Sequence, residues 1–218
     1  MIWFIIFFIS AISHELAHGY AAFRLGDPTA KEAGRLTINP LKHIDPFGTI
    51  LLPAIIILAN IFTNLKFVPL VIFKPVPINP IHFKHPDKDS FKVALAGPGI
   101  NLLYVLVMAI IIRLGLKITF IANSMIFINF IKYFGVWFIF VNLVIAAFNL
   151  IPIPPLDGSW ILNLLLPIRW KFYLNKARTY IVVLFIILFI SGRFSFIFYF
   201  FFDFFRKLTN WILIGKMI

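Results

Sequence analysis

Cysteine is absent from the 218-residue sequence, which excludes disulfides, thiolate nucleophiles and thiolate metal ligands. Acidic residues are scarce: eight Asp and Glu stand against twenty Lys and Arg, giving a formal net charge of +12. Charged residues make up only 13% of the chain, whereas 61% is hydrophobic and the mean hydropathy is +0.99. A soluble domain does not need this much apolar sequence, so we predict an all-α polytopic protein of the lipid bilayer.

The basic residues lie in short segments between apolar runs and do not form one continuous patch. Such a distribution suits anionic lipid headgroups and membrane topology, so nucleic acid is not expected as a partner. The sequence does not indicate an oligomeric state.

Three apolar runs, at 2–23, 91–112 and 125–150, are long enough to cross a bilayer as helices and are expected to form a three-helix core. A fourth run, 47–73, is interrupted by Pro53 and Pro69, so it is either re-entrant or crosses the membrane. One or two further spans are expected at 180–190 and 194–211, after a basic stretch. We therefore divide the chain into a core at 1–166 and a C-terminal transmembrane region at 167–218.

The first apolar run contains the sequence H-E-L-A-H at 14–18. Two histidines four residues apart lie on one face of a helix, about one turn from each other. His14 and His18 can then bind one metal ion, with Glu15 beside it as a general base, which is the H-E-x-x-H pattern of zinc proteases. Ionisable groups inside hydrocarbon are costly unless they are compensated, so a metal site is favoured over a structural role.

A catalytic zinc usually has three protein ligands, and Asp157 is the best candidate for the third. It follows a segment broken by Pro152, Pro154 and Pro155, where irregular backbone inside a membrane is tolerated only if it lines a site or is buried in protein. An alternative is that Asp157 caps the short helix that begins after Gly158.

His43 and Asp45 offer a different possibility, a second metal site or a hydrogen bond to a ligand histidine. We expect instead that they order the polar loop 24–46.

The pairing of H-E-x-x-H with a later N-x-x-P-x-P-x-L-D-G, which here runs from Asn149 to Gly158, resembles the site-2 protease family of intramembrane zinc metalloproteases. The element from Gly97 to Asn101 and the loop 34–48 also resemble that family, in a compact prokaryotic branch. The resemblance implies that His14, His18 and Asp157 bind one Zn²⁺ and that Glu15 is the base. It also implies that Asn149 contacts the substrate or the oxyanion. Asn101 is assigned the same role, with a structural role as the alternative.

The expected activity is hydrolysis of a peptide bond in or near a transmembrane segment of a membrane-protein substrate, by a zinc-activated water with Glu15 as base. A metal-binding membrane transporter and a catalytically inactive scaffold are the alternatives. Few polar groups line the spans outside the site, which argues against a transport pathway. Glu15 argues against a scaffold, because a pure binding site has no use for that carboxylate.

Asp157 can reach the two histidines only if the first and third spans run in the same direction. The segment 47–73 is then re-entrant or crosses twice, and we favour the re-entrant form. The basic residues up to position 178 then divide thirteen to three between the two sides of a cell membrane, and the positive-inside rule directs the site toward the cytoplasm. The thirteen are Arg24, Lys31, Arg35, Lys42, Lys66, Lys74, Lys84, Lys88, Lys92, Arg169, Lys171, Lys176 and Arg178, and the three are Arg113, Lys117 and Lys132.

Overall fold

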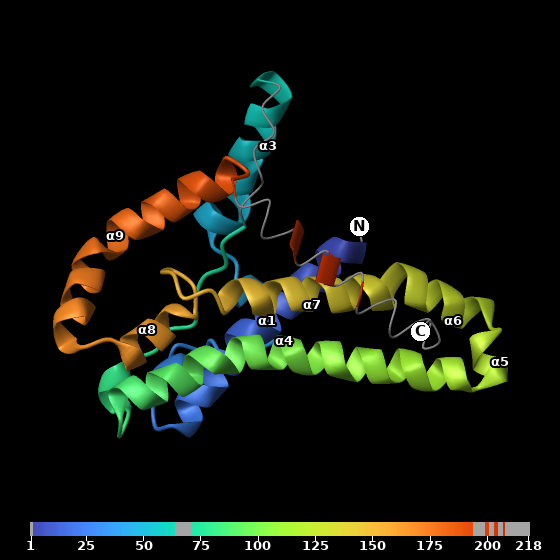
Figure 1. Cartoon of the computed structure of the whole chain (residues 1–218), viewed down its shortest axis with the longest axis horizontal. Helices are drawn as coiled ribbons and strands as arrows, with labels where there is room; N and C mark the ends of the chain where they lie inside the picture. The colour runs from blue at the N-terminus through green and yellow to red at the C-terminus, as the bar shows by residue number, and fades with distance from the viewer. Residues whose placement is uncertain (1, 64–70, 194–198, 201–202, 205–206, 208–218) are drawn as a thin grey trace.

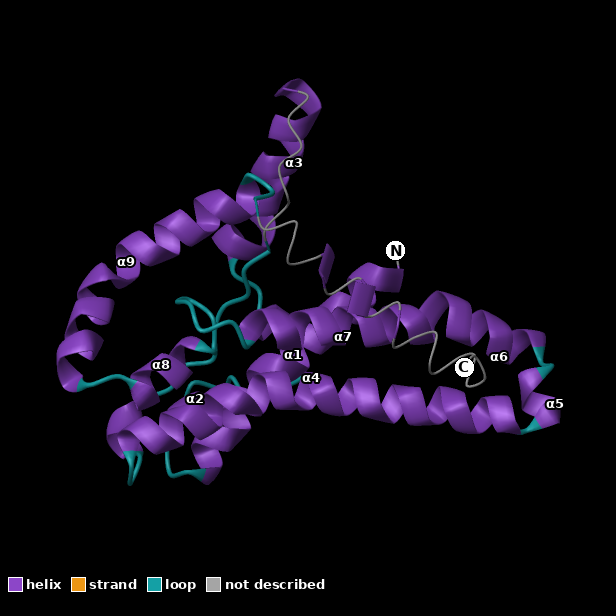
Figure 2. Ribbon diagram, viewed as in Figure 1, coloured by secondary structure: helices purple, strands orange, loops and turns teal. Residues whose placement is uncertain are grey.

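The computed structural model describes residues 2–63, 71–193, 199–200, 203–204 and 207, and within them it contains helices and no strands (Figure 2). Five helical segments of this described part are long and apolar enough to cross a membrane. They are Ile2–Arg24, Pro46–Thr63, Pro86–Lys117, Met125–Asn149 and Ile168–Ile190. The predicted all-α polytopic fold class is confirmed.

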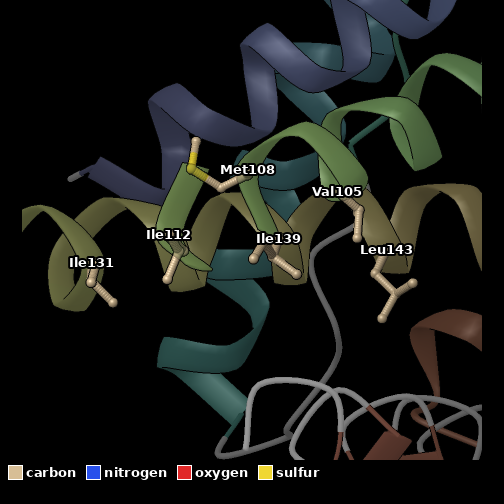
Figure 3. Close-up of a cluster of buried hydrophobic side chains, with 6 residues drawn as sticks. All are labelled: Val105, Met108, Ile112, Ile131, Ile139 and Leu143. Carbon is tan, nitrogen blue, oxygen red and sulfur yellow. The ribbon is translucent and has the colours of Figure 1, made fainter. Parts of the chain in front are cut away.

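Three long helices, α1 (Ile2–Arg24), α4 (Pro86–Lys117) and α7 (Val136–Asn149), pack against one another in the core (Figure 1). Helix α6 (Met125–Phe130) runs into α7 through a π-helical turn, Ile131–Gly135. Three buried side chains of α4 pack against three from this turn and α7 (Figure 3). The six residues are Val105, Met108, Ile112, Ile131, Ile139 and Leu143.

The remaining helices are short, except α9. They are α2 (Thr29–Glu32), α3 (Leu52–Thr63), α5 (Thr119–Ala122) and α8 (Ser159–Leu165), while α9 spans Ile168–Ile190. The predicted span at 180–190 is thus only the second half of α9: the helix starts directly after Pro167, and neither glycine nor proline interrupts it before Gly192. The other predicted C-terminal span, 194–211, lies mostly outside the described residues.

The interrupted run at 47–73 leaves the core as α3 and returns to where it began (Figure 1). The N–H of Ile72 donates to the carbonyl of Gly48 at 3.0 Å, and the Thr49 hydroxyl donates to the carbonyl of Ile72 at 2.6 Å. A segment that crossed once would separate its ends by about 30 Å, the thickness of the hydrocarbon layer. The contact between the two ends therefore disagrees with a single crossing and fits a segment that is re-entrant or crosses twice.

After this return the chain runs extended, without helix, from 71 to 79. The loop after α1 holds it in place: the N–H of Lys74 donates to the carbonyl of His43 at 3.0 Å, and the Arg35 guanidinium donates to the carbonyl of Lys74 at 2.6 Å. The extended segment 71–79 is thereby fixed beside α1.

Ile139 is 1% exposed and lies in the contact between α4 and α7, so Ile139→Ala should lower the free energy of unfolding by about 2–5 kcal/mol. Reversible unfolding in mixed micelles measures this loss. Leu106→Ala is the control, since Leu106 of α4 is 57% exposed and its truncation should have little effect. Equal losses in the two variants would contradict the assigned packing.

Candidate functional site

His14 and His18 lie one turn apart on α1, and their rings face the same carboxylate. Oδ2 of Asp157 lies 2.9 Å from Nε2 of His14 and 3.2 Å from Nε2 of His18. The three possible ligand atoms all lie within 4.8 Å of one another, and both imidazoles are buried. Residues up to 143 positions apart in the sequence therefore converge on one point.

The proline-broken segment brings Asp157 to this point. Helix α7 ends at Asn149, whose carbonyl accepts a hydrogen bond from the N–H of Gly158 at 2.6 Å and so closes a tight loop between the two residues. Within this loop Leu156 is buried against Phe185 and Phe189 of α9. Helix α8 starts at Ser159 without a side-chain cap, so the Asp157 carboxylate points to the histidines and does not cap the helix.

The orientation of each imidazole is set by a hydrogen bond at Nδ1, the nitrogen that does not face Asp157. Nδ1 of His18 lies 2.7 Å from the carbonyl of Val93, and Nδ1 of His14 lies 2.6 Å from Oδ1 of Asn101. A carbonyl oxygen only accepts, so Nδ1 of His18 carries a proton, and Nε2 is the nitrogen that faces Asp157.

Nε2 of His18 is buried and makes no hydrogen bond among the described residues, although Oδ2 of Asp157 lies only 3.2 Å away. A buried nitrogen that faces a carboxylate without a hydrogen bond calls for an explanation, and a bound metal ion supplies one. Two imidazoles and a carboxylate, with no thiolate in the chain, form a donor set that fits Zn²⁺.

Glu15 lies next to this cluster and is held by the extended segment. Its Oε2 accepts a hydrogen bond from the N–H of Val76 at 2.9 Å. A cavity of about 160 Å³ opens between the two elements. Its walls include Glu15, His18, Pro75, Val76, Ile78, Pro80, Ser90, Val93, Ala94, Asp157 and Trp160. A carboxylate base and an open space therefore lie beside the three candidate ligands.

Helix α4 forms the floor of the site at Gly97. A Cβ atom added there would lie 2.6 Å from Nε2 of His14 and closer still to Nε2 of His18. The backbone of α4 at Gly97 thus lies so close to the imidazole nitrogens of His14 and His18 that this position accepts no side chain.

The other candidates occupy different places. Asn101 contacts His14, and Nδ2 of Asn149 donates to the carbonyl of Ile145 at 3.0 Å. Nε2 of His43 donates to the carbonyl of Thr37, and Asp45 accepts from the N–H of Gly48, so both order their loop as expected. Neither belongs to a group of potential metal ligands in the described part of the chain.

Sequence reasoning missed two functional contacts, the carbonyl of Val93 and the N–H of Val76. Backbone groups leave no residue-type signal. Only the proline-rich composition around Val76 pointed to an extended chain near the site.

A family model described as "Peptidase family M50" matches residues 113–191, a range that contains Asp157. "Putative zinc metalloprotease YwhC" of Bacillus subtilis (strain 168) is 35% identical over 193 residues, covering 87% of this chain and 80% of that protein. This chain belongs to peptidase family M50, the site-2 protease family.

"Putative zinc metalloprotease Rip2" of Mycolicibacterium smegmatis (strain ATCC 700084 / mc(2)155) is 31% identical, covering 90% of this chain and 71% of that M50 relative. Its namesake in Mycobacterium tuberculosis (strain ATCC 25618 / H37Rv) is 28% identical, with coverage of 89% and 70%. No solved structure matches the chain. As an M50 member with spans of membrane length, the protein is a membrane-embedded zinc metalloprotease.

Gly97→Ala should remove zinc from the purified protein, because the added methyl group meets both ligand nitrogens. Metal analysis of protein purified with zinc measures the loss. Gly99→Ala on the same helix is the matched control, since a Cβ there meets nothing within 4 Å. Full zinc content in Gly97→Ala would show that the metal does not lie against α4.

The extended segment is also tied to the end of α1, through Asp27. This carboxylate is fully buried and accepts hydrogen bonds from the Thr29 hydroxyl and from the N–H of Asn79 at 2.7 Å, while Nδ1 of His82 lies 2.9 Å away. Burial raises the pKa of Asp27, but the hydrogen bonds from Thr29, Asn79 and His82 outweigh it and hold the pKa below its usual range.

A lowered pKa means that the folded protein favours the ionised carboxylate. The resulting stabilisation is complete above the unfolded-state pKa of about 3.9 and is lost as the pH falls through the lower folded value. Asp27→Asn should therefore destabilise the protein at pH 7, and its difference from the parent should shrink below about pH 4. Unfolding at several pH values tests this, with exposed Glu32→Gln as control. A pH-independent difference would contradict it.

Proposed function

We propose that this M50 protein hydrolyses a peptide bond in or near a transmembrane segment of a membrane-protein substrate. The observation that supports this most is the convergence of His14, His18 and Asp157 beside Glu15, at a cavity within a bundle of membrane-length helices. In this assignment the two imidazoles and the carboxylate hold one Zn²⁺. When bound there, zinc polarises a carbonyl and lowers the pKa of water toward neutrality.

Glu15 acts as the general base. Its carboxylate takes a proton from the attacking water and later delivers it to the amine that leaves when the C–N bond breaks. The N–H of Val76 keeps one carboxylate oxygen, Oε2, directed toward the extended segment, which leaves Oε1 for the water. Glu15 is half-buried, so the cavity shields this proton transfer from bulk solvent while still admitting water.

The two asparagines take separate roles in this proposal. Oδ1 of Asn101 accepts a hydrogen bond from Nδ1 of His14, so Asn101 positions a ligand and does not contact the substrate. Asn149 stays the proposed donor to the oxyanion, and it reaches the substrate by exchanging its bond to the Ile145 carbonyl for one to the developing charge.

The substrate is a membrane helix that unwinds locally and enters the cavity lined by Glu15, Val76 and Asp157. Successive residues of an extended chain direct their N–H and C=O groups to opposite sides. Ile72, Lys74 and Val76 bond inward, to the loop and to Glu15, so the outer edge belongs to Phe73, Pro75 and Pro77. Because proline has no N–H, this outer edge, which faces away from Glu15, offers mainly carbonyl acceptors.

The site is proposed to face the cytoplasm of a cell membrane. Lys171 of α9 pairs with Asp87 at the start of α4, at 2.7 Å, and His82 lies against Asp27 at the end of α1. These contacts gather the basic segments at one end of the bundle, whereas Arg113 and Lys117 end α4 at the other (Figure 1). The positive-inside rule then orients the molecule.

Zinc content and cleavage of a model transmembrane substrate, measured together in detergent, test this function. Glu15→Gln should keep its zinc and lose cleavage by about 10²- to 10⁴-fold, the usual contribution of a general base. Asp157→Ala should lose zinc affinity by more than the roughly 10- to 100-fold typical of outer-shell partners. Exposed Glu32→Gln, at the other glutamate of the chain, is the matched control.

Cleavage that survives in Glu15→Gln would overturn the mechanism, and a zinc-loaded parent protein without cleavage would favour a transporter or scaffold. Undiminished zinc in Asp157→Ala would remove this residue from the ligand set.

A further inference from the structure

Two asparagines lie fully buried where α1, α4 and α7 meet. Asn101 of α4 and Asn142 of α7 both have zero exposure, and Nδ2 of Asn101 donates to Oδ1 of Asn142 at 2.7 Å. Nδ2 of Asn142 in turn donates to the carbonyl of Phe138 at 2.8 Å, and Oδ1 of Asn101 lies 2.6 Å from Nδ1 of His14. A continuous chain of hydrogen bonds thus runs from a backbone carbonyl in α7, through two side chains, to His14.

The donors and acceptors in this series of hydrogen bonds have a fixed direction. The carbonyl of Phe138 only accepts, so it takes Nδ2 of Asn142 and leaves Oδ1 for Asn101. Asn101 must then present Nδ2 to Asn142, an orientation that the carbonyl of Ser10 supports at 3.4 Å. Only Oδ1 of Asn101 is left for His14, and an acceptor there requires a proton on Nδ1.

On the basis of the proposed zinc protease function, we propose that Asn142 is a positioning residue, which acts through Asn101 to hold His14 in the Nδ1-protonated tautomer with Nε2 free for metal. If Asn142 is removed, the amide of Asn101 is free to flip and to present Nδ2 to His14. The imidazole then protonates at Nε2, the nitrogen that faces Asp157, and cannot bind metal there.

His18 provides an internal comparison. Its Nδ1 donates directly to the backbone carbonyl of Val93, which cannot flip. Loss of Asn142 should therefore change His14 and leave the tautomer of His18 as it is. A role limited to helix packing would not distinguish the two imidazoles.

The full chain carrying Asn142→Leu tests this assignment, with zinc dissociation into a chelator as the readout. We expect dissociation to be about 10- to 100-fold faster than in the parent protein, the range for partners of metal-ligating histidines. The separate variant Asn142→Asp should keep the slow dissociation of the parent, because a protonated carboxyl both donates to the carbonyl of Phe138 and accepts from Nδ2 of Asn101. Leu143→Ala is the packing control: Leu143 is the next residue, is buried, and lies in a separate apolar cluster.

Dissociation within twofold of the parent in Asn142→Leu, or equal acceleration in Leu143→Ala, would overturn the assignment. A double variant adds a second test. Once Asn101→Leu is present, Asn142→Leu should accelerate dissociation no further, because Asn142 acts only through Asn101. If the two substitutions together accelerate dissociation by the product of their separate effects, the two residues act independently.

Histidine ¹⁵N NMR on the zinc-free chain separates this assignment from the protease function itself. The parent should show His14 protonated at Nδ1, and Asn142→Leu should show the other tautomer or a mixture, with His18 unchanged. If the His14 tautomer is the same in Asn142→Leu as in the parent, and the parent binds zinc and cleaves substrate, only the role of Asn142 is rejected. Failure of the parent to bind zinc would reject the proposed function, whatever the tautomer.

Discussion

The structure depends on one constraint: three titratable side chains, His14, His18 and Asp157, are brought together inside an apolar helix bundle. Each would be costly to bury alone, and each therefore needs defined partners on every polar atom. The carbonyl of Val93 and the amide of Asn101 satisfy the outer nitrogens of the imidazoles, which leaves two Nε2 atoms and a carboxylate facing one another. The packing of α1 against α4 and α7 is thus also the arrangement of the site.

Two kinds of structure meet at this point. Regular helices supply rigidity, with His14 and His18 one turn apart on α1 and Gly97 allowing α4 to approach. Irregular segments supply the third candidate ligand and cover the base, since Asp157 follows a proline-broken loop and the extended segment 71–79 lies over Glu15 of α1. Backbone of this kind occurs inside a membrane only when protein or an aqueous cavity surrounds it, which is the case here.

Much of the fold was predictable, because hydrophobic run length identifies spans and the H-E-x-x-H spacing identifies one face of a helix. The proline-broken segment also pointed correctly to Asp157 as a neighbour of the histidines. The start of α9 was predicted about twelve residues too late, since its basic residues look like a loop although nothing there breaks a helix. Asn142 was visible only as a polar residue within a span, because its partner is 41 positions away in the sequence.

The prolines flanking Val76 have a consequence for self-association. An exposed edge with alternating donors and acceptors is a template for a second copy of itself, which is how many β-rich proteins aggregate. The outer edge at Phe73, Pro75 and Pro77 has carbonyls but almost no N–H groups, so two such edges have little to exchange. The two prolines therefore protect this edge from pairing with a second copy of itself.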